Sequence, residues 1–447
     1  MIRTRLRNIK YITLALCALL LSAHALHAAP FVYVADTTGF NVAVIDAATN
    51  NVVTIDLMTT NTQDGIAISP DGKTAYVPCY NVTGTIQLID VATNTLLSPI
   101  SLGAGIQPDS IAITPNGLFA YVTVTTPTAG VLPINLTTMV VGSIITAGFG
   151  SPTTIVIAPN GLTAYVLDTA ADQVVPIDLT NNMPGTAIPG LTPGGLAVSP
   201  DSAYLYISND NSDVVSQYNI DGANRTNPSS IQTIGYPAIG SFVPTYLVIS
   251  PNGNTLYVSS ISSPRAIGAI DISNPASPLS SPDFLNLGPL GIGAPFAMAI
   301  TSDGKSLYGT INSQNVTIAV DITSPLAPTF IQSIPTAGAP AGLAITPLNL
   351  LPPASVSGCK TRNVFLLQTD YINNITWTAP ASGSPVTYNI YRDAALTELI
   401  ATISASSTLQ FCDHDRDPCV TYTYYITSVD SSGNQSTAAS VAVTQSC

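Results

Sequence analysis

Charged residues are scarce in this sequence. Asp, Glu, Lys and Arg together make up 8% of its 447 residues, whereas about 25% is usual for soluble domains. Thr, Ser, Asn, Gly and Pro take their place, which favours many short strands joined by turns. Hydrophobic residues reach 46%, enough to bury a sizeable core, so the low charge does not indicate disorder.

Histidine and glutamate are almost absent after residue 29. His414 is the single histidine there, and Glu398 is the single glutamate of the chain. Copper and iron sites need several histidines, and a dedicated calcium site usually includes a bidentate glutamate. The sequence also contains no GxSxG elbow, HExxH, Walker loop or GxGxxG fingerprint. We therefore expect no cofactor and no metal, and we assign no catalytic residue.

Basic residues cluster at the start of the chain, at Arg3, Arg5, Arg7 and Lys10. An apolar stretch, Ile12–Leu21, follows, and small residues lead from it to Ala29. The pattern predicts a secretory signal peptide over residues 1–29, because its apolar core is too short to span a bilayer; an uncleaved N-terminal anchor is the alternative. We expect an exported protein, periplasmic, on the cell surface or secreted, with no transmembrane segment after cleavage.

Loss of this segment leaves eight basic and 25 acidic residues, a net charge of −17. Nucleic acids and anionic membranes are bound by clustered Lys and Arg side chains. Here the basic residues are few and scattered, so we expect no nucleic-acid partner.

A repeat follows the first segment. Gly65–Val77 (GIAISPDGKTAYV), Ser110–Val122 (SIAITPNGLFAYV) and Tyr246–Val258 (YLVISPNGNTLYV) are three of its copies. In each, Pro presets φ, Asp or Asn bonds back to the backbone and Gly accepts positive φ, which predicts a hairpin. Two more strands follow, such as those around VIDAATN at Val44–Asn50. Four strands per unit are typical of a propeller blade.

The turn positions give the number of units. Pro70, Pro115, Pro159, Pro200, Pro251, Ser302 and Pro347 are separated by 45, 44, 41, 51, 51 and 45 residues. Phe31–Asp36 matches a second strand without a first, and Gly342–Pro347 matches a first strand without a second. We therefore predict an all-β fold, a seven-bladed β-propeller over residues 30–349, with one blade built from three N-terminal strands and one C-terminal strand. An outer-membrane barrel is the alternative, but it needs lipid-length strands and aromatic girdles.

The repeat resembles the YVTN-type β-propeller family, which includes YncE-like periplasmic and surface-layer proteins. Ser69–Val77 matches the SPDGKTAYV part of the family pattern, and Val42–Val53 (VAVIDAATNNVV) matches its second part. The resemblance covers roughly residues 31–349 and implies the propeller fold. It implies little about function, because such propellers occur in enzymes, binding proteins and surface proteins.

A second domain is predicted after a Pro/Ser-rich linker over residues 350–358. Residues 359–447 contain strand patterns such as NITWTAP at Asn374–Pro380 and VTYNIYRD at Val386–Asp393. They resemble a fibronectin type III module, an immunoglobulin-like β-sandwich. The resemblance implies a buried Trp377 and a tyrosine corner at Tyr422.

The cysteines of this domain suit an oxidising compartment. They are Cys359, Cys412, Cys419 and Cys447. Four cysteines allow three pairings, of which we favour Cys412–Cys419 with Cys359–Cys447. Cys79 lies in the repeat region and is expected to be a buried apolar residue.

Aspartates supply the remaining candidates for chemistry. Those that recur before the turn after the third strand are expected to bond turn amides: Asp46, Asp90, Asp178, Asp271 and Asp321. Asn209–Asp213 (NDNSD) is a weaker candidate for a calcium loop. The residue before each first strand is expected at the mouth of the central channel, namely Asp64, Asp109, Thr153, Gly194, Thr245, Phe296 and Ala341. Of these, Asp64, Asp109, Thr153, Thr245 and Phe296 are our candidates for ligand contacts.

Two functions are compatible with these features. The main prediction is an exported non-enzymatic recognition or adhesion protein, a monomer whose propeller face binds a protein or glycan partner. The alternative is a lactonase-like propeller hydrolase that uses Asp and Asn at the channel mouth. DNA binding, proposed for some YncE-like relatives, is disfavoured by the net charge of −17.

Overall fold

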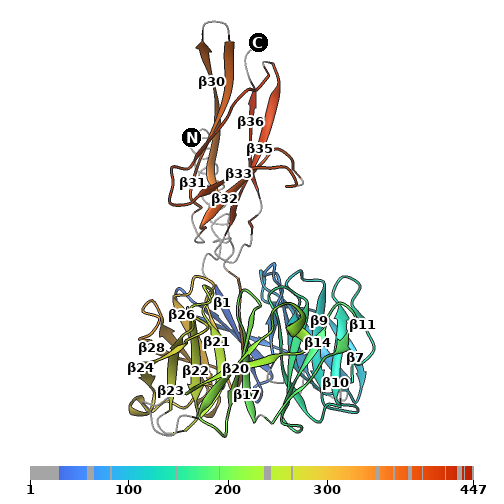
Figure 1. Ribbon diagram of the computed structural model, residues 1–447. Helices are drawn as coiled ribbons and strands as arrows, with labels where there is room; N and C mark the ends of the chain where they lie inside the picture. The colour runs from blue at the N-terminus through green and yellow to red at the C-terminus, as the bar shows by residue number, and fades with distance from the viewer. Residues whose placement is uncertain are drawn as a thin grey trace, which may run out of the picture.

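The structure is a computed structural model of the chain. It describes residues 30–57, 65–80, 83–146, 148–190, 192–235, 243–262, 265–347, 353–365, 368–380, 385–394, 396–417, 419–429, 435–436 and 438–444. The fold is all-β and β-propeller-like, built from many four-stranded antiparallel sheets (Figure 1). Its short 3-10 helices within these ranges are η1 (Gly222–Thr226), η2 (Gly288–Leu290) and η3 (Asn312–Gln314).

Seven sheets are formed by strands β1–β29; six contain consecutive strands of the chain, and the first adds β29 to β1, β2 and β3. The first is β29 (Pro340–Ile345), β1 (Phe31–Asp36), β2 (Asn41–Asp46) and β3 (Val52–Asp56); the second is β4 (Ala67–Ile68), β5 (Thr74–Cys79), β6 (Thr83–Asp90) and β7 (Thr95–Ala104). The third is β8 (Pro108–Ile113), β9 (Phe119–Val124), β10 (Gly130–Asn135) and β11 (Val140–Val141); the fourth is β12 (Pro152–Ile157), β13 (Thr163–Asp168), β14 (Gln173–Asp178) and β15 (Met183–Pro184), with β16 (Ile188–Pro189) on β14. The fifth is β17 (Pro193–Val198), β18 (Tyr204–Asn209), β19 (Val214–Asn219) and β20 (Ser229–Gly235). The sixth is β21 (Pro244–Ile249), β22 (Thr255–Ser260), β23 (Ala266–Asp271) and β24 (Leu279–Asn286); the seventh is β25 (Ala297–Ile300), β26 (Ser306–Ile311), β27 (Val316–Asp321) and β28 (Thr329–Pro335).

The repeated turn has the predicted chemistry. In the second sheet, Ser69 Oγ donates to Asp71 Oδ1 at 2.6 Å and accepts from Thr74 N at 3.0 Å. Gly72 between them has φ 70°, which glycine adopts without strain. The same network recurs at Ser250 with Asn252 and at Thr301 with Asp303. These side-chain bonds fix the hairpin locally, which is why the sequence pattern predicts it.

The first sheet joins the two ends of the repeat region. β1 pairs antiparallel with β29, with Val32 opposite Ile345 and Val34 opposite Leu343. The predicted combination of three N-terminal strands and one C-terminal strand is therefore present in this sheet. It covers the edge that β1 would otherwise expose.

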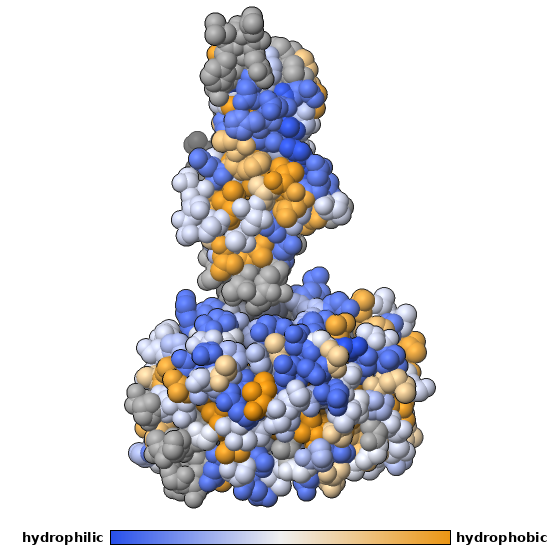
Figure 2. Space-filling model, viewed as in Figure 1, coloured by the Kyte–Doolittle hydropathy of each residue, from blue (hydrophilic) through white to orange (hydrophobic). Residues whose placement is uncertain are grey.

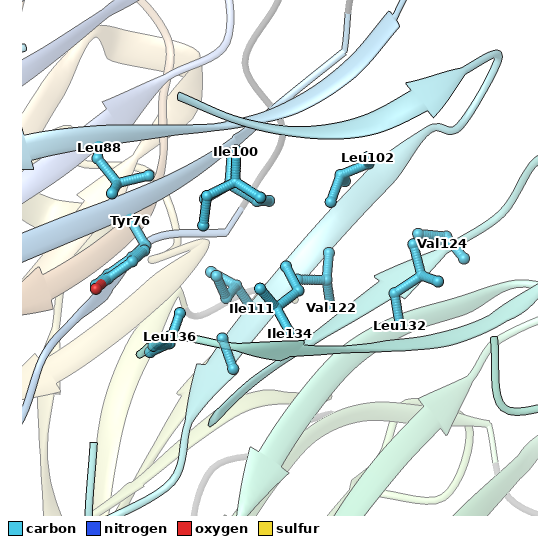
Figure 3. Close-up of a cluster of buried hydrophobic side chains, with 12 residues drawn as sticks. Tyr76, Leu88, Ile100, Leu102, Ile111, Val122, Val124, Leu132, Ile134 and Leu136 are labelled. Carbon is cyan, nitrogen blue, oxygen red and sulfur yellow. The ribbon is translucent and has the colours of Figure 1, made fainter. Parts of the chain in front are cut away.

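The seven sheets pack on one another in a closed series. Seven clusters of buried apolar side chains each span two consecutive sheets, and one of them joins the seventh sheet to the first. Figure 3 shows the cluster between the second and third sheets, where Tyr76, Ile100 and Leu132 lie among its labelled members. Tyr308 of the seventh sheet also donates its hydroxyl to the carbonyl oxygen of Ala47 in the first, at 3.5 Å.

Strands β30–β36 form two further sheets. One is β30 (Ala354–Phe365), β31 (Gln368–Thr378) and β34 (Gln410–Asp413); the other is β33 (Leu399–Ser404), β32 (Thr387–Tyr391), β35 (Thr421–Val429) and β36 (Ala439–Thr444). They share one core cluster, in which Trp377 and Tyr388 meet edge-on with ring centroids 5.6 Å apart.

Figure 2 shows polar and apolar residues mixed over the surface of the seven-sheet part.

Two side chains of this part match features that the sequence predicts. Trp377 is 4% exposed. Tyr422 has its hydroxyl 3.2 Å from the amide nitrogen of Asp417, which donates to it. A tyrosine hydroxyl bound to backbone a few residues upstream is the geometry of a tyrosine corner.

The predicted disulfides are not formed. Cys359 and Cys412 are exposed free thiols, whereas Cys419 is disulfide-bonded; Cys447 lies outside the described residues. The Cys412–Cys419 and Cys359–Cys447 pairings are therefore wrong. Cys359 and Cys412 both lie opposite Asn374, on the strands at either side of β31, so they are two strand spacings apart and too distant to bond. Cys79 is buried in an apolar cluster, as expected.

Alkylation of the native protein tests this assignment. We expect iodoacetamide to modify Cys359 and Cys412 without prior reduction, because both are exposed thiols, and to modify Cys419 only after reduction. Peptide mass spectrometry gives the extent at each site. If Cys412, like Cys419, reacts with iodoacetamide only after reduction, the Cys412–Cys419 pairing is correct after all.

Candidate functional site

A cavity of about 520 Å³ lies where the first strands of the seven sheets converge. Each sheet contributes at least one residue to its wall: Ala341, Gly65, Asp109, Thr153, Gly194, Tyr246 and Phe296 in order from the first sheet to the seventh. Its size is within the range of small-molecule sites.

The cavity opens at one defined edge of the sheets, which we call the mouth. In the fifth sheet, Pro193 at the start of the first strand is opposite Asn209 at the end of the second, and Asn209 is opposite Val214 at the start of the third. The mouth therefore consists of the starts of the first strands and the loops from second to third strands. β29 ends with Ile345 opposite Val32, at the other edge, so the chain leaves the seven sheets on the side away from the mouth.

Most of the predicted mouth residues lie together in this cavity. Asp109, Thr153 and Phe296 line it, as do Gly194 and Ala341, whereas Asp64 lies outside the described residues. Thr245 does not line the cavity. It is 5% exposed and its Oγ1 lies 2.8 Å from Ser259 Oγ.

Tyr246 takes the place predicted for Thr245. The pairing of β21 with β22 shifts register between Pro244 and Leu247, and the first strands of the third and fifth sheets have the same shift at equivalent residues. Tyr246 then packs against Phe296 of the next sheet, with ring centroids 5.2 Å apart and planes tilted by 49°. In the third and fourth sheets the equivalent residues, Ser110 and Thr154, line the cavity together with the predicted Asp109 and Thr153; in the sixth sheet only the second of the two residues does.

Asp210 is the residue of this site that the sequence alone does not place here. It follows β18 directly, and its amide donates to the carbonyl oxygen of Thr192 at 2.9 Å. Gly194 makes room for its carboxylate, because a Cβ at that position would lie 2.2 Å from Asp210 Oδ1. The side chain is thereby directed into the cavity wall, beside the start of β17.

The carboxyl of Asp210 is electrostatically unusual. Its Oδ1 is buried and has no hydrogen-bond partner. Burial disfavours the charged form and raises the pKa of Asp210 to about 6. A carboxyl with this pKa is largely ionised at neutral pH yet accepts a proton more readily than an ordinary aspartate.

The two aspartates of the predicted calcium loop, Asn209–Asp213, line different cavities. Asp210 lines the central cavity, whereas Asp213 lines a different one with Gln232 and Leu279. Within the described ranges, no group of three or more His, Cys, Asp and Glu residues is arranged to hold a metal ion. A sequence signal for Asp210 does exist: the position after the second strand is Thr37, Thr125 and Thr169 in three other sheets and is acidic in the fifth.

The recurring aspartates after the third strands have the predicted structural role. Each accepts a backbone N–H of its own turn: Asp46 from Ala48, Asp90 from Thr93, Asp178 from Thr180, Asp271 from Ser273 and Asp321 from Thr323. Asp178 also accepts a hydrogen bond from Arg225 at 2.7 Å, and this guanidinium lowers the pKa of Asp178 to about 2.

Comparison with known proteins identifies the fold. No protein-family model matches the sequence, and no curated protein matches it. A functionally unknown protein from Desulfotomaculum acetoxidans is 16% identical, with a TM-score of 0.58 and coverage of 71% of this chain and 99% of that one. A candidate 6-phosphogluconolactonase from Bacteroides uniformis is 17% identical, with a TM-score of 0.57 and the same coverage. The periplasmic gluconolactonase of Pseudomonas aeruginosa is 16% identical, with a TM-score of 0.58, again covering 71% and 99%.

These structures overturn the main functional prediction. A non-enzymatic recognition or adhesion protein is the wrong expectation, because the solved structures that share the fold include a gluconolactonase and two candidate 6-phosphogluconolactonases, which favour the alternative, a lactonase-like hydrolase. The YVTN and fibronectin type III resemblances stay predictions. In the part of the chain that the structure describes, no helix is long and apolar enough to cross a membrane. The chain thus shares the all-β, propeller-like fold of these proteins, at identities that establish fold alone.

Proposed function

We propose that the protein is a lactonase-like hydrolase whose active site is the cavity at the mouth, with Asp210 as the general base. One observation carries the proposal: a carboxylate that is partly buried, with one oxygen unpartnered, in the wall of a cavity of about 520 Å³. Groups with perturbed pKa values in clefts are candidates for catalysis. The fold shared with gluconolactonases supports the reaction class.

The reaction follows from the position of this carboxylate. Asp210 removes a proton from a water molecule while the water oxygen bonds to the lactone carbonyl carbon, and the carbonyl electron pair moves to its oxygen. When that pair returns, the ring C–O bond breaks and the leaving ring oxygen takes the proton from Asp210. The product is a hydroxy acid, which releases its acidic proton to solvent. Proton transfer of this kind contributes about 10²–10⁴-fold to a rate.

Other residues of the wall supply polar contacts. Ser110 and Thr153 line the cavity, and their hydroxyls can donate to a carbonyl oxygen that becomes negative or accept from substrate hydroxyls. Asp109 lines the same cavity from the third sheet, two sheets away from Asp210. We assign Asp109 a part in the negative charge of the site, and we assign proton transfer to Asp210 alone.

The same proposal covers the architecture and location. We propose that the seven sheets are the blades of a closed seven-bladed propeller over residues 30–349, supported by the closed series of core clusters. Residues 350–358 are then a linker and residues 359–447 an immunoglobulin-like, fibronectin type III-like domain, supported by Trp377 and Tyr422. Residues 1–29 are proposed as a signal peptide, so the enzyme works outside the cytoplasm.

The pH dependence of hydrolysis tests the assignment of the base. With glucono-δ-lactone as substrate, we expect kcat/KM to rise as pH increases through about 6 and to level off above it, because only ionised Asp210 accepts the proton. A pH-stat, corrected for spontaneous hydrolysis, measures the rate. No hydrolysis above the spontaneous rate, or a profile without an inflection near this pH, would contradict the proposal.

A further inference from the structure

We propose that the substrate is an uncharged lactone and that the mouth discriminates against phosphorylated lactones. This inference rests on the proposed function and adds the substrate class to it. The distinction matters because the fold is shared both by a gluconolactonase and by candidate 6-phosphogluconolactonases. The charge of the mouth separates the two substrate classes.

The charged residues among the described lining of the cavity are all acidic. Of the lining residues that the structure describes, Asp109, Asp210 and Tyr246 are ionisable, and none is Lys or Arg. A phosphate ester carries about −1.5 to −2 at neutral pH and is usually held by Arg, Lys or several backbone amides. Placed in this cavity, it would lose hydration and meet carboxylates instead.

The cations of the seven-sheet part lie elsewhere. Residues 30–349 contain four, namely Lys73, Arg225, Arg265 and Lys305. Lys73 and Lys305 precede second strands, and Arg225 lies between a third and a fourth strand, so all three are at the edge opposite the mouth. Arg265 is at the mouth edge but is exposed and does not line the cavity.

Further carboxylates add to the negative potential at the mouth. Asp36 is opposite Pro340 and Asp168 is opposite Pro152, so both lie at the same edge as the cavity opening. Each accepts hydrogen bonds from backbone amides, Asp36 from Thr38 and Asp168 from Ser151. For Asp168 such bonds outweigh the effect of burial and hold its pKa below the usual value. These carboxylates outnumber Arg265 at this edge, and a net negative charge around an opening repels an approaching anion and reduces its association rate.

The uncharged part of the wall suits a hydroxylated ring. Tyr246 and Phe296 form a continuous aromatic surface across two sheets, against which the apolar face of a sugar ring can pack. Ser110 and Thr153, which have hydroxyl side chains, line the same cavity. A neutral sugar lactone therefore finds both kinds of contact without a charge to neutralise.

The same potential acts on the product. Hydrolysis converts the neutral lactone into a carboxylate, which then lies beside Asp109 and Asp210. Repulsion between like charges favours its release, so gluconate is expected to inhibit weakly. The site thus binds a neutral molecule and expels an anion.

The test compares glucono-δ-lactone with 6-phosphoglucono-δ-lactone on the full-length protein. We expect kcat/KM to be at least about tenfold higher for the neutral lactone at low ionic strength. Raising ionic strength from about 0.01 M to about 1 M should narrow the preference, because salt screens the carboxylates. Asp109→Asn should reduce the ratio of the two kcat/KM values by about three- to tenfold, because the phosphorylated lactone is hydrolysed faster. Asp221→Asn is the matched control, because Asp221 is exposed, makes no side-chain cap and lies at the opposite edge.

Each outcome decides a different claim. Equal rates, or faster hydrolysis of the phosphorylated lactone, would overturn the substrate class while the proposed hydrolase survives. Hydrolysis of neither lactone would overturn the proposed function and this inference with it. The preference for the neutral lactone could also stay the same in Asp109→Asn, in Asp221→Asn and at high salt. That result would show that carboxylates at the mouth do not cause the preference.

Discussion

Replacing Asp210 with Asn is expected to lower kcat/KM for lactone hydrolysis by about 10²–10⁴-fold, the usual contribution of a general base. The amide has nearly the same shape but cannot take a proton from water. Gly194 still leaves space for it, since the side chain keeps its size. Initial rates at pH 7.5 to 8 give the measurement, because wild-type Asp210 is then ionised.

The same substitution is expected to stabilise the fold at high pH. The pKa of Asp210 is raised to about 6 by burial, whereas an aspartate in an unfolded chain has a pKa of about 3.9. Between these values the folded protein binds more protons than the unfolded chain, so the free energy of unfolding falls as pH rises through this window. Asp210→Asn removes that cost, and we expect a gain of roughly 1–3 kcal/mol at pH 8 and little change at pH 4.

Activity and stability moving in opposite directions exclude misfolding as the cause of the lost activity. Asp213→Asn is the matched control in the same loop, since Asp213 lines a different cavity and its positive φ of 50° suits asparagine. We expect it to leave both quantities near wild type. Retention of more than a tenth of the activity by Asp210→Asn would rule out Asp210 as the base.

Deleting residues 31–56 is expected to abolish cooperative folding of the seven-sheet part. The deletion removes β1, β2 and β3, leaves β29 without its partner, and opens the core clusters on both sides of the first sheet. Domains are stable by only about 5–15 kcal/mol, and the loss of two clusters of buried side chains exceeds this. Urea denaturation followed by circular dichroism measures the transition.

The control for this deletion is removal of residues 353–447. Strands β30–β36 form a core cluster of their own, separate from the seven clusters of the repeat region. We expect this variant to keep a cooperative transition and lactone hydrolysis. A cooperative transition in the variant that lacks residues 31–56 would show that the remaining sheets close without the first one.

Much of the fold was predictable because its chemistry is local. Ser69, Asp71 and Gly72 build a hairpin from bonds within six residues, and the spacing of such turns counts the sheets. The disulfides were not predictable in the same way. A disulfide needs Cα atoms within about 7 Å and side chains that face each other, and the nearness of Cys412 and Cys419 in the sequence does not decide either.

The candidate site likewise contains residues that the sequence predicts and residues that only the structure places there. Sequence alone determined that seven similar four-stranded units occur, that the starts of their first strands meet, and that Asp109, Thr153 and Phe296 belong to that place. Only the tertiary structure decided that Tyr246 and not Thr245 lines the cavity, and that Asp210 enters the wall beside Gly194. The physical reason is that hydrogen bonds of turns are set by neighbours in sequence, whereas the desolvation that makes a carboxylate reactive is set by sheets that meet only after the chain has closed on itself.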